Sequence, residues 1–274
     1  MTSVTLTIDL EDPNGVYAAD GRYVAMTHSL LDFCDKIQRR ATFFAVGRVA
    51  EAAPELIKTI AARGHEIAYH THNHVPLTQE NRERFQRESS IDKLLLEQLS
   101  GKPVTGFRAP GFSLTRKSLW ALDVLGALGF RYSSSIMPTN ISRYGFPGAP
   151  RAPFLWPNGM IELPLPVSLL GPLHVPYLGG IYLYALPFWA VHFLLRRADQ
   201  KEMLWTYAHP YDFDTEEAFR PMPNTPLWIS WVLWRARRRA APQIRRVMGH
   251  SDTETLGERI AGSEFTAGLK RYQP

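Results

Sequence analysis

The chain has 274 residues, of which 45% are hydrophobic and 21% are charged, and its formal net charge at pH 7 is +5. This balance is typical of a soluble globular protein, and the single cysteine, Cys34, excludes an internal disulfide framework. The N-terminal residues lack the pattern of a secretion signal, and the longest apolar run, residues 188–195, is too short to span a bilayer, so we expect a cytoplasmic protein.

Strand and helix patterns alternate along most of the chain. Residues 4–8 alternate and are β-branched, which predicts a strand. Further strands are expected at residues 41–46, 65–69, 104–108, 130–133, 161–165 and 203–207, and helices at 29–39, 54–63, 79–99, 115–128 and 187–197. Residues 137–160, rich in proline, glycine and aromatics, are expected to be irregular.

This alternation favours parallel strands joined by helical crossovers, with ligands at the carboxyl ends of the strands. The fold class is therefore α/β, and we expect a distorted (β/α) barrel over residues 1–215. A C-terminal helical extension over residues 216–274 is expected to pack on the same domain.

A histidine-rich stretch follows the third predicted strand. Four of the nine histidines lie between His65 and His74. The spacing of His70 and His74 places both imidazoles on one side of a helical turn or of a tight turn after the strand, so the pair can bind one divalent cation. His65 and His72 are competing ligands, and surface polarity or capping is the alternative interpretation.

Polar groups also follow two other predicted strands. Asp9, Glu11 and Asp12 end the first strand, and His209 follows the last one. In a parallel barrel these ends share one rim, where two histidines and a carboxylate can bind zinc while the remaining groups transfer protons. That combination predicts metal-assisted hydrolysis. A solvated acidic turn and a histidine with only a structural role are the alternatives.

The order of these motifs resembles the NodB-type polysaccharide deacetylases, carbohydrate esterase family four, over about residues 4–212. The matching segments are Thr7–Asp12, His70–His74 preceded by Gly64–Ile67, Arg108–Phe112 and Leu204–His209. The family implies a seven-stranded barrel. The segment Gly179–Tyr182 and a Ser-Ser-Ile run are similar to a subgroup associated with exopolysaccharide or lipid-linked glycan assembly.

The resemblance also implies roles for individual residues. Asp9 would be the general base, His209 the general acid, and Arg108 the partner that keeps Asp9 ionised and oriented. His70 and His74 would be metal ligands. The expected substrate-binding residues are Pro110, Phe112, Ser134 and Tyr182.

Two positions depart from the family pattern. The family motif has adjacent aspartates, base then ligand, whereas Leu10 and Glu11 separate Asp9 from Asp12. The third ligand is therefore Asp12 or Glu11, and Asp12 is preferred because it precedes the proline-containing turn. Ser133 stands where the family has an aspartate that orients the acid. A neutral serine there lowers the expected pKa of His209, unless another residue takes over the orienting role.

Tryptophans and arginines are concentrated late in the chain, at Trp228, Trp231, Trp234 and the arginines between residues 235 and 246. Packing of this helix on the barrel, with the arginines in solvent, is the favoured interpretation. The alternative is peripheral contact with an anionic membrane at the inner face. The basic residues form no nucleic-acid-reading motif, so no nucleic-acid partner is expected.

The motifs together predict a metal-dependent hydrolase that removes an N-acyl group, most plausibly acetyl, from an amino sugar of a polysaccharide or lipid-linked glycan precursor. The expected cofactor is one divalent metal, with Zn²⁺ preferred over Co²⁺, Ni²⁺ or Mn²⁺. Hydrolysis of another non-peptide C–N bond, such as deformylation, is an alternative. A catalytically silent glycan-binding or assembly protein on the same barrel is another.

Overall fold

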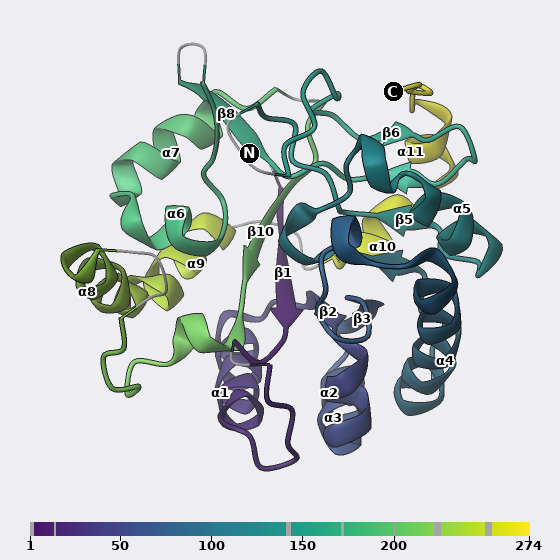
Figure 1. Ribbon diagram of the computed structural model, residues 1–274. Coiled ribbons are helices and arrows are strands. Elements are labelled where there is room, and N and C mark those ends of the chain that lie inside the picture. The colour runs from purple at the N-terminus through teal and green to yellow at the C-terminus, as the bar shows by residue number, and fades with distance from the viewer. Residues whose placement is uncertain are drawn as a thin grey trace.

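The computed structural model describes residues 3–13, 15–140, 144–170, 173–199, 201–221, 226–249 and 254–274. A curled, mostly parallel sheet forms a half-barrel at the centre of the molecule, and helices surround it (Figure 1). The eight strands of this sheet lie in the order β10-β1-β2-β3-β4-β5-β7-β6. Two further strands, β8 (Val167–Leu170) and β9 (Leu173–Pro176), pair with each other in a separate antiparallel hairpin.

The main-sheet strands are β1 (Val4–Leu10), β2 (Ala41–Ala45), β3 (Glu66–Tyr69), β4 (Gly106–Phe107), β5 (Tyr132–Ser133), β6 (Phe154–Leu155), β7 (Ile161–Glu162) and β10 (Leu204–Ala208). The helices are α1 (Arg22–Ile37), α2 (Gly47–Ala52), α3 (Pro54–Ala62), α4 (Arg82–Ser100), α5 (Trp120–Ala127), α6 (Gly180–Ala185), α7 (Phe188–Arg196), α8 (Leu227–Ala236), α9 (Ala240–Met248), α10 (Leu256–Ile260) and α11 (Ser263–Ala267). Short 3-10 helices include η4 (Pro210–Phe213) and η5 (Arg237–Arg239).

The expected α/β barrel class is confirmed, but the expected count of seven strands is wrong. All seven predicted strands are present, and β6 is the eighth. It arises inside the segment expected to be irregular and pairs antiparallel with β7 at the edge of the sheet. Two residues are too few for a period-2 pattern to be visible in the sequence.

Helix α1 begins at Arg22 rather than near Ser29. Its buried face includes Tyr23 and Thr27 as well as Leu30, Leu31 and Cys34. The polar Thr27 interrupts the apolar pattern that would have revealed the first turns. Its hydroxyl donates to the Tyr23 carbonyl oxygen at 2.7 Å, so the buried oxygen is satisfied within the helix.

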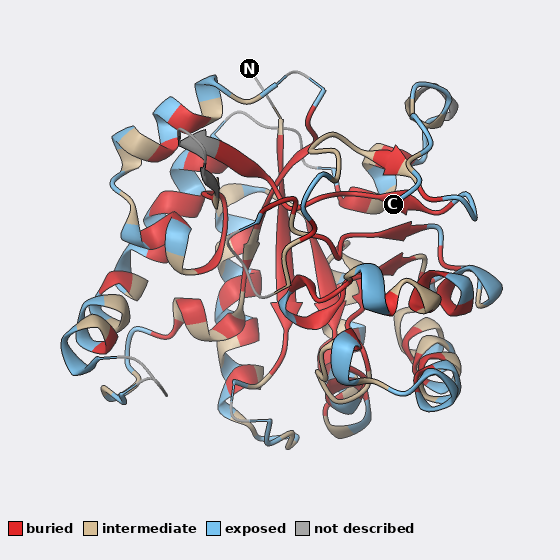
Figure 2. Ribbon diagram, turned by 45° about the horizontal axis from the view of Figure 1, so that its top comes forward, coloured by how far each residue is buried: buried red, intermediate tan, exposed pale blue. Residues whose placement is uncertain are grey.

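The strand order brings the polar strand ends together. Strand β1 is buried along its whole length and pairs in parallel with β10 on one side and β2 on the other. Strand β3 follows β2 in the sheet. The carboxyl ends of β10, β1 and β3 therefore meet at one edge, where buried residues are concentrated on the strands (Figure 2).

Helices α6, α8 and α9 form a group beside β1 and β10, at the left of Figure 1. Helix α6 contacts both α8 and α9, and α9 contacts β1. Among the residues that the structure describes, no helix combines the length and the apolar character needed to traverse a lipid bilayer.

Candidate active site

Glu11, His70 and His74 meet at the carboxyl edge of the sheet. One ligand atom from each residue lies within 4.8 Å of the others. His70 Nε2 is 3.9 Å from Glu11 Oε2, and His74 Nε2 is in close contact with the same oxygen. The two imidazole rings are 5.0 Å apart. Two histidines and one carboxylate form a donor set that suits a catalytic divalent metal, with room left for further ligands.

The tautomer of His70 is set by the backbone. Its Nδ1–H donates to the Arg108 carbonyl oxygen at 2.8 Å, which leaves the Nε2 lone pair facing the cluster. Burial lowers the pKa of His70 to about 4, even though Asp9 and Glu11 act to raise it. The ring is therefore neutral near pH 7, as a metal ligand must be.

The two histidines are carried by a loop after β3, which confirms the tight post-strand turn rather than the helical turn. The backbone of this loop is strained, and hydrogen bonds from α2 hold it in place. Thr71 and His74 have φ angles of 61° and 56°, in the left-handed region. The backbone N–H groups of Gly47 and Arg48, at the start of α2, donate to the carbonyl oxygens of Thr71 and His72 at 2.9 and 3.1 Å. The surrounding fold thus maintains a conformation that the loop alone would disfavour.

The carboxylate beside the histidines belongs to Glu11, so the preference for Asp12 is not supported by the geometry. Glu11 is buried directly after β1, whereas Asp12 is one residue further along and partly exposed. Glu11 Oε2 is buried without a well-aligned hydrogen bond. Because the His70 lone pair also faces this oxygen, a cation between them would relieve the repulsion, and the donor set fits a metal.

Asp9 and Arg108 form a buried ion pair next to this cluster. Arg108 Nη1 donates to Asp9 Oδ1 at 2.6 Å and to Thr7 Oγ1 at 2.8 Å. Burial by itself would raise the pKa of Asp9, but Arg108, followed by His70 and His209, holds it below its ordinary value. Asp9 is therefore ionised at neutral pH and available as a base.

Aromatic rings enclose the Arg108 guanidinium. Its Cζ lies 3.9 Å from the Phe44 ring centre, 4.4 Å from Trp205 and 5.6 Å from Phe112. Pro110 and Phe112, expected to contact substrate, are buried in the short 3-10 helix Pro110–Phe112. Ser134, also expected to contact substrate, is fully buried and accepts from Arg108 Nη2 at 3.1 Å, so it supports the arginine.

His209 lies on the other side of Glu11, with Nε2 3.8 Å from Glu11 Oε1. Its Nδ1 is 2.9 Å from Oδ2 of Asp212, a residue in η4 that the sequence analysis did not single out. Burial alone would lower the pKa of His209, but Asp212, and then Glu11 and Asp9, raise it to about 9. Asp212 therefore holds the His209 ring, and His209 is protonated at neutral pH. The sequence signal for Asp212 was its position three residues after the histidine.

Ser133, at the position of the family's orienting aspartate, has another partner. Its hydroxyl donates to Ser135 Oγ at 2.8 Å within the buried end of β5. Tyr211, also missed by the sequence analysis, stacks on the His209 ring at 4.5 Å between centres and donates to Glu11 Oε1 at 3.3 Å. Tyr211 therefore links His209 to Glu11 through direct contacts.

The two competing histidines lie elsewhere. His65 is buried and its Nδ1 accepts from the Ala41 backbone N–H at 3.0 Å, which is a structural role. His72 pairs with the buried Asp92 of α4, with Nδ1 3.1 Å from either carboxylate oxygen. The Tyr69 hydroxyl also donates to Asp92 at 2.9 Å, so this carboxylate anchors the loop between the two candidate ligands.

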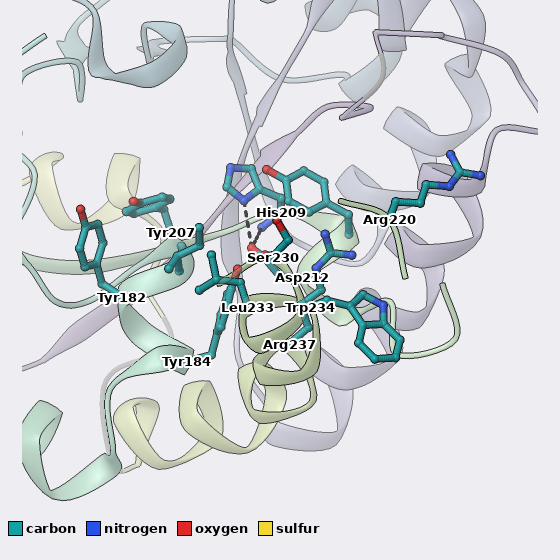
Figure 3. A pocket seen from close by; sticks show the side chains of 13 residues that line it. Tyr182, Tyr184, Tyr207, His209, Asp212, Arg220, Ser230, Leu233, Trp234 and Arg237 are labelled. Atoms are coloured by element: carbon teal, nitrogen blue, oxygen red, sulfur yellow. Dashed lines mark hydrogen bonds and ion pairs between the residues drawn. The ribbon is translucent and has the colours of Figure 1, made fainter. Parts of the chain in front are cut away.

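Tyr182, the remaining expected substrate-binding residue, lies at a cavity next to His209 (Figure 3). The site as a whole places an ionised carboxylate, Asp9, and a protonated imidazole, His209, around the Glu11–His70–His74 cluster. A carboxylate that can accept a proton, a donor set that could hold a metal and an imidazolium that can donate a proton are the groups that metal-assisted hydrolysis of an amide requires.

Comparison with known proteins identifies two segments. Residues 2–132 match the polysaccharide deacetylase family model, and residues 134–260 match a domain of unknown function, DUF3473. A chitooligosaccharide deacetylase from Sinorhizobium fredii is 36% identical over 124 residues, which is 45% of this chain and 50% of that protein. A peptidoglycan-N-acetylglucosamine deacetylase from Bacillus cereus is 26% identical over 155 residues, 52% of this chain and 56% of that protein.

The chain therefore aligns with about half the length of these curated relatives. The crystal structure of a Mycobacterium smegmatis protein assigned as a polysaccharide deacetylase has a TM-score of 0.57 to this chain at 18% identity. The similarity covers 100% of this chain and 97% of the other, and it supports the fold. Residues 2–132, which carry Asp9, Glu11, His70, His74 and Arg108, therefore match the polysaccharide deacetylase family.

Proposed function

We propose that this protein is a metal-dependent hydrolase that removes the N-acetyl group from an amino sugar in a glycan. One observation carries the proposal: the Glu11–His70–His74 cluster lies between the ionised Asp9 and the protonated His209. The related proteins that act on chitooligosaccharide and peptidoglycan support the carbohydrate substrate.

A metal would be held by Glu11, His70 and His74, where it would polarise the amide carbonyl and acidify a water molecule. Asp9 accepts a proton from the attacking water. Arg108 keeps Asp9 ionised and fixes the direction of its carboxylate through the 2.6 Å contact. His209 donates its Nε2 proton to the departing nitrogen, and Asp212 holds the ring through Nδ1. The proposed products are acetate and a free amino sugar.

Zinc is the proposed metal, because two imidazoles and one carboxylate are frequent ligands of catalytic zinc. Cobalt, nickel and manganese bind similar nitrogen and oxygen donors and are the alternatives to test. The proposed substrate is a precursor of an exopolysaccharide or a lipid-linked glycan, as the resemblance of Gly179–Tyr182 to that subgroup suggested, and the proposed location is the cytoplasm.

The test combines metal analysis with activity. We expect about one zinc ion per chain in purified protein, lost in the His70→Ala, His74→Ala double variant, and acetate release from acetylated amino sugars by the metal-loaded wild type only. The exposed His28→Ala variant is the matched histidine control and should keep both metal and activity. Full metal content in the double variant, or metal-loaded wild type without acetate release, would refute the proposal.

The silent glycan-binding alternative was motivated by Ser133. The 2.9 Å contact between Asp212 and His209 removes that reason, because a carboxylate does orient the acid. A deformylase would use the same groups, so formylated and acetylated amino sugars should be compared in the same assay.

Peripheral membrane contact is a second proposal, carried by the outer face of α8. Trp228 is 69% exposed and Trp231 is 49% exposed, with Leu227 and Val232 also exposed beside them. The arginines that follow, Arg235, Arg238 and Arg239, are exposed as well. Exposed aromatic residues next to basic ones suit the interface of an anionic membrane.

Vesicle co-sedimentation tests the membrane proposal without reference to catalysis. Binding should require anionic lipid, weaken with salt, and fall in the Trp228→Ala, Trp231→Ala variant. The Ile91→Ala, Leu94→Ala variant on α4 removes a similarly exposed apolar pair and is the control. Equal sedimentation of wild type and the tryptophan variant would refute membrane binding through the outer face of α8.

A further inference from the structure

We propose that the cavity enclosed by α6, η4 and α8 binds the sugar ring attached to the departing nitrogen. This inference rests on the proposed deacetylase function and names the part of the chain that would select the sugar. The cavity has a volume of about 250 Å³, and His209 forms part of its wall (Figure 3).

The position of His209 relates the cavity to the reaction. Its ring has Nε2 on the side of Glu11 and Nδ1 on the side of Asp212, and both His209 and Asp212 line the cavity. A general acid must come within hydrogen-bond distance of the nitrogen that it protonates. With the acetyl group at the Glu11–His70–His74 cluster and the nitrogen at His209 Nε2, the attached ring would lie beside the His209 imidazole, which borders the cavity.

The lining suits a pyranose ring. Tyr182 and Tyr184 come from α6, Tyr207 from β10 and Tyr211 from η4, while Trp234 contributes from α8. Aromatic faces bind the apolar C–H faces of a ring, and phenol hydroxyls at their edges can bond its hydroxyl groups. Ligand pockets for larger molecules usually measure about 300–1,000 Å³, so this cavity suits one sugar residue.

Two glycines noted in the sequence build one wall. A Cβ at Gly179 would lie 1.9 Å from Tyr207 Cδ1, and a Cβ at Gly180, whose φ is +52°, would lie 2.9 Å from the Tyr207 hydroxyl oxygen. The backbone at the start of α6 can therefore lie directly against the Tyr207 ring. This contact sets the direction from which α6 brings Tyr182 and Tyr184 to the cavity.

The charges around the cavity favour a neutral sugar. The charged groups close to it are paired, His209 with Asp212 and Arg237 with Glu217. Arg220 is exposed at the rim, and its side chain extends away from His209 in Figure 3. A sugar carboxylate would therefore meet Asp212 without a dedicated cationic partner inside the cavity.

All these residues lie within residues 134–260, the segment that matches the domain of unknown function. Asp9, Arg108 and the three candidate ligands lie within the polysaccharide deacetylase segment. The structure thus assigns the base and the metal site to the first segment, and the acid and the sugar-binding cavity to the second.

Two variants test the cavity in the metal-loaded protein. Tyr182→Ala removes a 41% exposed ring at the rim, and Leu233→Trp adds bulk to the wall contributed by α8. Calorimetry with N-acetylglucosamine and its disaccharide measures binding, and acetate release measures turnover. Both variants should weaken saccharide binding about ten-fold or more and raise KM accordingly.

The controls separate this inference from the proposed function. Trp189→Ala removes a 74% exposed ring on α7, outside the cavity, and should bind saccharide like the wild type. Turnover of N-acetylglucosamine and of 4-nitroacetanilide, which has no sugar ring, should also stay at the wild-type level in Trp189→Ala. Unchanged saccharide binding in both variants, or a metal-loaded wild type that binds no saccharide, would refute the proposal that this cavity binds the sugar ring. Saccharide binding that both variants lose, in a wild type without turnover, would support the cavity and count against the deacetylase.

Discussion

Asp212 Oδ2 lies 2.9 Å from Nδ1 of His209, within one turn of the same short helix. The backbone N–H of His209 also donates to this oxygen at 2.8 Å, so the carboxylate is fixed relative to the ring. A single segment thus carries the proposed acid, His209, and the carboxylate that holds its ring.

Asp212→Asn should lower the pKa of His209, because Asp212 is the main group that raises it to about 9. His209 acts in its protonated form, so activity falls as the pH rises through its pKa. The basic limb of the pH–rate profile should therefore move to lower pH in the variant, with activity at the optimum reduced about 10- to 100-fold. Glu216→Gln, an exposed neighbour, is the control, and an unmoved basic limb would contradict the prediction.

Glu11→Gln should weaken zinc binding far more than Asp12→Asn, because Glu11 lies with the two histidines. We expect a loss of at least about ten-fold in zinc affinity for the first variant. Competition with a coloured chelator at fixed pH measures both affinities. A larger loss for Asp12→Asn would restore the assignment favoured from the sequence.

Arg108→Lys should impair catalysis while keeping the positive charge. The lysine cannot reproduce the contacts of the guanidinium with Asp9, Thr7 and Ser134. The pKa of Asp9 should rise, so the acidic limb of the pH–rate profile moves to higher pH, and kcat/KM should fall about 10- to 100-fold. The exposed Arg84→Lys serves for comparison, and wild-type kinetics in Arg108→Lys would show that the charge alone suffices.

His65 should make the protein less stable in acid. Burial lowers its pKa to about 4, against an ordinary value of 6.5. Protonation of Nδ1 would also break the bond from the Ala41 N–H. Since the folded pKa is the lower one, its contribution is complete above about pH 6.5 and is lost as the pH falls toward 4. The full effect is about 3 kcal/mol in the free energy of unfolding.

Urea unfolding of wild type and His65→Asn between pH 4.5 and 7.5 measures this contribution. The asparagine oxygen can accept the same hydrogen bond without titrating. The variant should therefore show the shallower dependence of unfolding free energy on pH, and parallel curves for the two proteins would contradict the assignment.

The sequence by itself determined the parallel α/β plan and the strand ends that carry the chemistry. Seven buried strands and their crossover helices have periodic patterns, and the ends with Asp9, His70 and His209 follow from them. The sequence did not predict the eighth strand, β6, because it is only two residues long. It did not predict the first turns of α1, because Thr27 lies on their buried face.

Tertiary structure decided which polar groups at those ends meet. Position along the chain favoured Asp12 as a ligand, but Glu11 is the carboxylate that lies with the two histidines. The cavity between α6, η4 and α8 also required the fold, because it depends on how distant elements pack, whereas Asp212 follows His209 by only three residues. Periodicity reports which face of an element is buried, whereas side-chain distances across elements are set only when the elements pack together.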